Sequence, residues 1–231
     1  SQKGWVSGKG RTAVWRDVDW AGKVVDPQYL MAAADLAASP KGNAGPKIAY
    51  MRISSAANTR TTIATYLRGS PAGDSVFFFV ANDTPTQTAC VASGVLSSFV
   101  FDAVIRQRLG GLNMSEFILV EAPLPLHTKR MLDLATGLLL GLSLSDRLFA
   151  SEWLLLEQFH TTKKAWRAHW ALAPVRRLEK LASFNAFVAC WYGLTSRELE
   201  RALGDCDWPS GSSTSAFDTK GFWRVDKDKD P

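Results

Sequence analysis

The sequence predicts an α+β protein in which a mixed sheet-and-helix domain is followed by a small all-α helical bundle. Up to about residue 127, runs of β-branched and aromatic residues alternate with helical segments and turn residues. Beyond that point leucines and aromatic residues recur at helical spacing. We therefore divide the 231 residues into a domain at 1–127, a helical domain at 128–207, and a linker with a tail at 208–231.

The composition is that of a packed protein with a moderate basic excess. Hydrophobic residues make up 46% of the chain and charged residues 21%. The net charge of +5 and the pI near 9.2 are compatible with a polyanionic partner, although many basic proteins have none. The abrupt beginning and the charged end suggest a piece of a larger protein.

The three cysteines and the apolar stretches favour a reducing, cytoplasmic setting. Cys90, Cys190 and Cys206 are too widely spaced for a disulfide framework or a CxxC metal site. Cys90 and Cys190 lie in apolar helical contexts, so we expect both to be small core residues. No signal peptide opens the chain, and its most apolar stretch, residues 132–145, is too short to span a bilayer. A membrane is therefore not an expected partner.

The first half of the chain begins with strands and a helix. Residues 4–20 alternate loosely and predict one or two short strands. Asp26 and Pro27 are typical of a helix start, and the Ala- and Leu-rich residues 28–38 form the expected helix body. The β-patterns at 47–54 and 61–67 then predict a strand pair.

A further strand and a long helical region follow the pair. The continuous apolar run at 75–80 predicts a buried strand. Thr84-Pro85-Thr86 is a plausible helix start, and the chain is expected to be helical through Leu96 and again from Phe99 until Gly110-Gly111 ends it. Residues 117–120 could form one more strand, closed by two prolines.

The second half predicts three or four helices. Residues 131–144 are rich in leucine, and Ser145-Asp146 caps a second helix. The apolar side of that second helix is predicted to comprise Leu148, Phe149, Trp153, Leu156 and Phe159. Pro174 lies in the first turn of a third helix, and Thr195 with Glu198 forms a capping box for a short fourth.

The sequence shows no recognisable catalytic pattern. The spacing of a phosphate-binding loop is missing around Gly8-Lys9-Gly10. The three histidines do not pair with other ligands at metal spacing, and no nucleophile elbow supports a triad. Catalysis, a metal and a cofactor are therefore not expected of this chain by itself.

Three stretches resemble the C-terminal part of large adenine-N6 DNA methyltransferases of the type IIG restriction-modification kind and of related phage-defence methyltransferases. The first is R-x-S-S-x-x-N-T-R-T at 52–61, and the second is the run at 96–125. The family pattern of the second run is carried here by Leu96, Ser97, Asp102, Arg106, Arg108, Asn113, Pro123 and Pro125. The third comprises residues 185–206 with the tail at 220–231. Ser97 and Asn185 depart from the family, which commonly has Asn and an acidic residue there.

The resemblance implies that residues 1–127 are a target recognition domain for double-stranded DNA. It also implies a methyltransferase core of the same parent chain, outside this sequence, in which S-adenosylmethionine would be the cofactor. Arginine can bond two edge atoms of guanine and Asn can do so with adenine, while Thr suits a base or a phosphate. The candidate DNA contacts are Arg52, Asn58, Arg60, Thr61, Arg106, Arg108 and Asn113.

Other interpretations of these residues stay open. Instead of contacting DNA, Asn58 could serve only to shape a turn, Arg60 could simply lie on the surface, and Asn113 could serve only as a cap. Arg106 and Arg108 are two apart on a helix, so one phosphate contact is more plausible than two. The alternative function is a helical protein-interaction or scaffold module of a phage-defence complex, and a third hypothesis is a cryptic nuclease.

Overall fold

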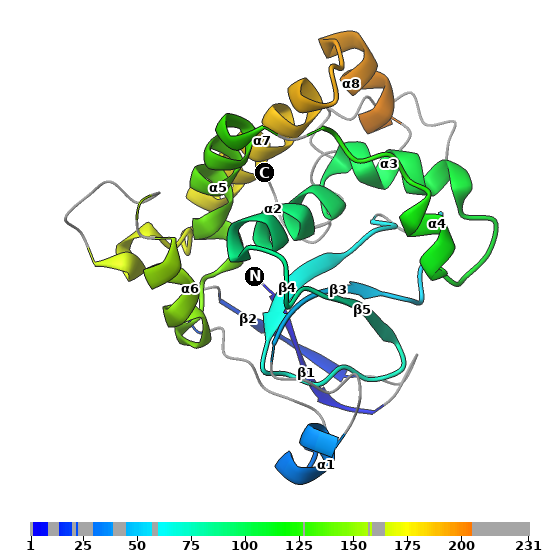
Figure 1. Ribbon diagram of the computed structural model, residues 1–231. Coiled ribbons are helices and arrows are strands. Elements are labelled where there is room, and N and C mark those ends of the chain that lie inside the picture. The colour runs from blue at the N-terminus through cyan, green and yellow to red at the C-terminus, as the bar shows by residue number, and fades with distance from the viewer. Residues whose placement is uncertain are drawn as a thin grey trace.

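The protein combines helices with two small antiparallel sheets, which confirms the predicted α+β class (Figure 1). The computed structural model describes residues 2–8, 14–19, 22, 30–38, 45–56, 60–126, 128–156, 158 and 165–204. The strands are β1 (Gln2–Ser7), β2 (Val14–Val18), β3 (Pro46–Met51), β4 (Ala64–Arg68) and β5 (Val76–Val80). A short helix, α1 (Ala33–Ala38), lies between β2 and β3 and forms part of the predicted helix at 28–38.

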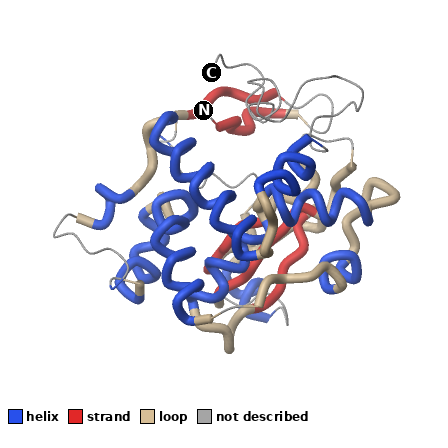
Figure 2. Tube along the Cα trace, turned by 90° about the horizontal axis from the view of Figure 1, so that it is seen from above, coloured by secondary structure: helices blue, strands red, loops and turns tan. Residues whose placement is uncertain are grey.

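The strands form two separate units. β1 and β2 make an antiparallel hairpin, as predicted for residues 4–20, and Figure 2 shows it near the N-terminus, apart from the larger sheet. The larger sheet has the order β4-β3-β5 with both pairs antiparallel. The predicted strand pair at 47–54 and 61–67 is confirmed, with Ile48 opposite Tyr66.

Two helices cover one face of the three-stranded sheet (Figure 1). They are α2 (Thr86–Leu96) and α3 (Phe99–Arg108). Tyr50 of β3 stacks on Phe79 of β5 with ring centroids 5.5 Å apart, and both pack against Phe101 of α3. Because alternate strand residues point to the same face, this apolar set identifies the face that the helices bury.

The two helical stretches predicted between Thr86 and Gly110 are separate helices, interrupted by two serines. Ser97 turns its hydroxyl to β4. Ser98 accepts a hydrogen bond from the N–H of Phe101 at 3.2 Å and so begins α3. Among the described residues, no single helix is long and apolar enough to cross a membrane. α2 and α3 together have that length and composition, but they bend by 61° at the break.

The second half is helical, as predicted. Its elements are α5 (Lys129–Ser143), the 3-10 turn η3 (Arg147–Phe149), α6 (Ala150–Leu155), the 3-10 turn η5 (Trp166–His169), α7 (Pro174–Trp191) and α8 (Ser196–Gly204). Pro174 is in the first turn of α7. The predicted capping box is confirmed, because the N–H of Thr195 donates to Glu198 Oε2 at 2.8 Å and the N–H of Glu198 donates to Thr195 Oγ1 at 3.3 Å.

The hydrophobic core continues across the boundary predicted at residue 127. One cluster contains Val95 of α2, Leu139 of α5 and Phe184 of α7. Gly94 permits the close approach, since a Cβ there would lie 2.7 Å from Leu139 Cδ2 and 2.9 Å from Phe184 Cζ. The helical half therefore packs directly on the helices that cover the sheet.

Four predictions from the sequence are wrong. The strand predicted at 75–80 is present as β5, but it is not buried, because it lies at the edge of the sheet with residues 76–79 half-buried and Val80 exposed. Residues 117–120 belong to a helix, α4 (Glu116–Val120), because a short apolar run does not by itself distinguish a strand from a helix. Cys190 is exposed rather than buried, although Cys90 is buried as expected. Leu148 is 61% exposed because η3 replaces the first turn of the expected helix, whereas Trp153 is buried.

A buried carboxylate joins the sheet to α6. Glu152 is fully buried and accepts hydrogen bonds from the Tyr66 hydroxyl at 3.1 Å and from Ser151 Oγ at 2.8 Å. The Arg68 Nε atom lies 3.2 Å from the Glu152 carboxylate. Burial first, and then the charge of Glu152, raise the pKa of the Tyr66 phenol.

Candidate nucleic-acid interface

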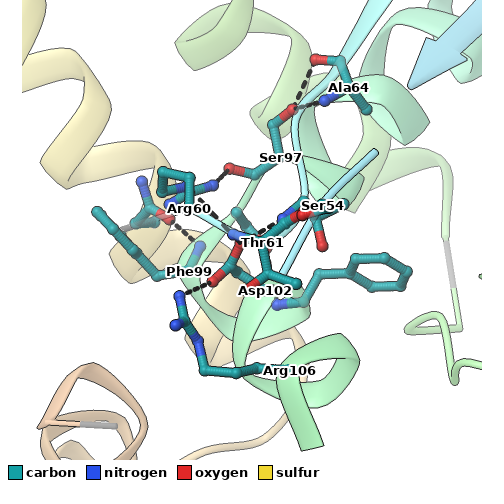
Figure 3. Close-up of polar contacts among 12 residues, drawn as sticks. Ser54, Arg60, Thr61, Ala64, Ser97, Phe99, Asp102 and Arg106 are labelled. Carbon is teal, nitrogen blue, oxygen red and sulfur yellow. Dashed lines mark hydrogen bonds and ion pairs between the residues drawn. The ribbon is translucent and has the colours of Figure 1, made fainter. Parts of the chain in front are cut away.

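The connection between β3 and β4 is fastened to α3 by Asp102 (Figure 3). The Asp102 side chain is fully buried. Its Oδ1 atom accepts hydrogen bonds from the N–H of Thr61 at 2.8 Å and from the N–H of Thr62 at 2.6 Å. A carboxylate that accepts two main-chain donors fixes the backbone that supplies them.

Two arginines surround the same carboxylate. Arg106, one turn further along α3, places Nη2 2.9 Å from Asp102 Oδ2, and Arg60 Nε lies 3.8 Å from Oδ1. Arg106 also donates to the carbonyl of Ala56. The Arg106 side chain is only 8% exposed and that of Arg60 only 14%. The buried carboxylate is thus neutralised and its oxygens are occupied, which a buried charge requires.

Arg60 makes further contacts with the break between α2 and α3. It donates from Nη2 to the carbonyl of Ser97, and its guanidinium lies 4.5 Å from the centroid of the Phe99 ring. The Ser97 hydroxyl in turn accepts from the N–H of Ala64 at 2.9 Å and donates to the carbonyl of Ala64 at 2.6 Å. Arg60 is therefore held by hydrogen bonding and by cation–π contact.

Hydroxyl groups close the connection on itself. Ser54 Oγ donates to the carbonyl of Thr61, and Thr61 Oγ1 donates to the carbonyl of Ser55 at 3.3 Å. Arg106 bonds to Ala56 in the first described part of the connection, and Asp102 accepts from Thr61 in the second. Both described parts of the connection are therefore held by α3. We call the described residues of this connection, 54–56 and 60–62, the anchored loop.

The structure brings three of the candidate DNA contacts together but turns them inward. Arg60, Thr61 and Arg106 all belong to the Asp102 network, and Thr61 is 1% exposed. Their polar groups bond to other parts of the same chain, so they could contact DNA only after those bonds broke. Asn58, a fourth candidate, lies outside the described residues.

The remaining three candidates are more exposed. Arg52 donates from Nη1 to Asp74 at 2.9 Å, lies 4.9 Å from the Phe77 ring centroid and is 35% exposed. Arg108 is exposed and donates to the carbonyl of Glu121 at 3.2 Å. Asn113 is also exposed.

Arg52 and Asn113 belong to neighbouring backbone segments. The N–H of Met114 donates to the carbonyl of Arg52 at 2.8 Å, and the N–H of Ser54 donates to the carbonyl of Leu112 at 3.0 Å. Residues 52–54 are therefore paired with residues 112–114, directly before the anchored loop. Arg52 and Asn113 thus lie beside the start of the loop, whereas Arg108 contacts Glu121 at the end of α4.

Sequence reasoning missed the roles of Asp102 and Asn185. Asp102 stands between Phe101 and Ala103, which are both buried, and a carboxylate within such an apolar helical run is a signal for a paired buried charge. Asn185 of α7 accepts from the N–H of Phe99 at 2.8 Å and so satisfies a donor at the start of α3. No comparable local signal identifies Asn185, because its partner is far away in sequence.

The described part of the chain contains no group of three or more His, Cys, Asp or Glu side chains that could hold a metal ion. What the arrangement offers chemically is a fixed loop with exposed hydrogen-bonding side chains beside it.

No protein-family model matches this chain, and searches of the curated proteins and of the solved structures also find no match.

Proposed function

We propose that the chain is a sequence-specific recognition module for double-stranded DNA that belongs to a restriction-modification type adenine-N6 DNA methyltransferase. The observation that carries the proposal is the anchored loop. Ala56 and Arg60, each two residues from Asn58 along the chain, are both held by hydrogen bonds to α3 or its N-terminal junction. Recognition side chains act best on backbone that is already fixed, because less ordering is needed upon binding.

The proposal assigns different roles to the candidate residues. Asn58 is the leading base reader, since an Asn amide can bond two edge atoms of adenine in the major groove. Arg52, Arg108 and Asn113 contact phosphates or bases beside it. Arg60, Thr61 and Arg106 are positioning residues, which hold the loop through Asp102.

The proposal also places the chain in the cytoplasm beside a methyltransferase core of the same parent protein. That core would bind S-adenosylmethionine and carry out the methyl transfer. The core cluster shared by α2, α5 and α7 joins the helical half to the helices that cover the sheet. The helical half then serves as a support on which the recognition residues are carried.

The test starts with selection of bound sequences from a pool of random duplexes at low salt. We expect enrichment of one short site, with an affinity that falls steeply as salt rises because phosphate contacts release counterions. Asn58→Ala should reduce the preference for the selected site by roughly 1–3 kcal/mol without changing the thermal stability. Asn82→Ala, at an exposed position after β5, is the matched control and should leave both unchanged.

Arg60→Ala separates positioning from reading. It should lower the unfolding midpoint together with the site preference, because Arg60 bonds within the chain. An absence of duplex binding at low salt would contradict the proposal. A selected site that Asn58→Ala leaves unaltered would remove Asn58 as the reader.

A second candidate function is a protein-interaction or scaffold module, and one observation favours it. α4 and the segment after it expose large apolar side chains: Phe117 is 63% exposed, Val120 66%, Leu124 54% and Leu126 95%. Contiguous exposed apolar residues are typical of protein contact surfaces. Phe117→Ser with Val120→Ser should abolish partner capture under this alternative, whereas duplex binding should survive the change under the DNA proposal.

A further inference from the structure

The outer edge of β5 presents main-chain groups that point away from its own sheet. β5 is an edge strand, because the sheet order is β4-β3-β5. The N–H of Ala81 donates to the carbonyl of Pro46 at 2.9 Å, and the N–H of Arg52 donates to the carbonyl of Ser75 at 3.0 Å. Hydrogen-bonded and non-hydrogen-bonded pairs alternate along an antiparallel strand. The main-chain N–H and C=O groups of the odd-numbered residues of β5 therefore point to β3, and those of the even-numbered residues point outward.

Most of these outward groups have no hydrogen-bond partner within the described part of the chain. The exception is the N–H of Val76, which donates to the carbonyl of Gly73 at 2.9 Å. The N–H and C=O of Phe78 and of Val80, and the C=O of Val76, bond to no described residue. Val80 is 46% exposed, and residues 76–79 are half-buried.

The sequence of the edge does nothing to prevent strand pairing. Natural edge strands commonly carry a Lys, a Pro or a bulge that discourages association. Residues 75–80, SVFFFV, contain no charge and no proline, and the β3–β5 register is regular along β5. Such an edge is a template for another extended strand.

We propose that the edge binds β5 of a second copy of this chain, antiparallel, about a twofold axis through Phe78. Phe78 then faces its own counterpart, and Val76 faces Val80 of the second copy. Each Phe78 N–H donates to the other Phe78 carbonyl, and each Val80 N–H donates to the other Val76 carbonyl. Two three-stranded sheets become one six-stranded sheet.

The second copy fits this edge better than an arbitrary strand because the free groups are self-complementary. Both free donors of the edge, the N–H of Phe78 and that of Val80, meet a free carbonyl of the second copy. The Val80 carbonyl is left facing the N–H of Val76, which already donates to Gly73 within its own chain. At the flanks Asp74 faces Asn82 rather than another acid, so the symmetry does not bring like charges together. A twofold interface requires this match of a surface to itself.

Cysteine cross-linking tests the register. The background carries Cys190→Ser and Cys206→Ser, which leaves the buried Cys90 as the native thiol. Directly opposed residues in such a pair have Cα atoms about 5.5 Å apart, within disulfide range. A mixture of Val76→Cys and Val80→Cys chains should therefore form a cross-linked dimer under mild oxidation. Val80→Cys alone, whose thiols would be several residues apart, is the control and should not.

The solution mass tests the association itself. The full chain should sediment with twice the mass of one copy at high concentration, and Phe78→Glu should raise the dissociation constant about tenfold or more by opposing two carboxylates on the axis. The substitution should still fold, because Phe78 is only half-buried at the sheet edge and the new carboxylate can reach solvent. A monomeric chain, or a dimer that gives no 76–80 cross-link, would overturn the proposal. If Phe78→Glu did not fold, the cross-link would decide alone.

Discussion

Asp102 and Glu152 are both fully buried carboxylates, yet their surroundings differ in kind. Asp102 accepts from two main-chain N–H groups and has two arginines around it, both largely withdrawn from solvent. Glu152 accepts from two hydroxyls, and its arginine, Arg68, is 38% exposed. One carboxylate fixes a backbone segment, whereas the other joins side chains of two elements.

This difference in surroundings predicts that the charges of Asp102 and Glu152 contribute differently to stability. The two arginines around Asp102 are largely withdrawn from water. Removal of the charge of Asp102 therefore leaves them buried, with neither a counter-charge nor solvent to stabilise them. Arg68 can be solvated if the charge of Glu152 is lost, and hydroxyls can bond to a neutral amide as readily as to a carboxylate. Equal burial of two carboxylates therefore does not imply equal contributions to stability.

The largest expected effect is that of Asp102→Asn, which we expect to lower the free energy of unfolding by about 3–5 kcal/mol. The amide oxygen can still accept from Thr61 and Thr62, but the amide nitrogen then faces the Arg106 guanidinium, and donor meets donor. Urea unfolding followed by circular dichroism measures the loss. A cost below about 1 kcal/mol, the level of an exposed ion pair, would show that the network is not a buried charge centre.

The matched change, Glu152→Gln, should cost about 1 kcal/mol. The Gln oxygen can accept from the Tyr66 hydroxyl and the Gln nitrogen can donate to Ser151, so only the attraction to Arg68 is lost. The same urea titration gives the value. If the two substitutions cost the same, the distinction between backbone anchoring and side-chain joining is wrong.

The fold was predictable where local chemistry decides it. The turn residues and β-branched runs predicted β3 and β4, Pro174 predicted the start of α7, and Thr195 with Glu198 predicted the capping box. The helical conformation of the short run at 117–120 was not predictable, because tertiary packing determines that Ile118 and Leu119 are buried on one side of α4.

The arrangement of the site was less predictable for the same reason. Arg60 and Arg106 were singled out as hydrogen-bonding arginines, but sequence contains nothing that distinguishes an arginine facing solvent from one facing Asp102, which is 42 residues from Arg60. Their partner is defined only once the loop folds over α3. The exposed Arg108, two residues after Arg106, shows how a small change in helical position reverses the outcome.

The smallest expected effect concerns the pH dependence of stability at Tyr66. Burial, then the charge of Glu152 and then Cys90, raise its pKa, and Arg68 partly opposes this rise. The unfolded chain releases the phenol proton near pH 10, while the folded chain retains it. The folded state thus binds more protons, so stability from this group is complete below about pH 10 and falls as pH increases further, by at most about 1.4 kcal/mol per unit.

Tyr66→Phe should therefore unfold with a shallower loss of stability between neutral and strongly alkaline pH than the unsubstituted chain. Burial raises the pKa of Tyr192 to about 12, and burial with the charge of Glu116 raises that of Tyr50 to about 12, so part of the alkaline loss will remain. Urea unfolding of both chains over the same pH series isolates the contribution of Tyr66 as the difference between them. Parallel curves would mean that the phenol titrates alike in the folded and unfolded states, and that Glu152 does not hold it in its protonated form.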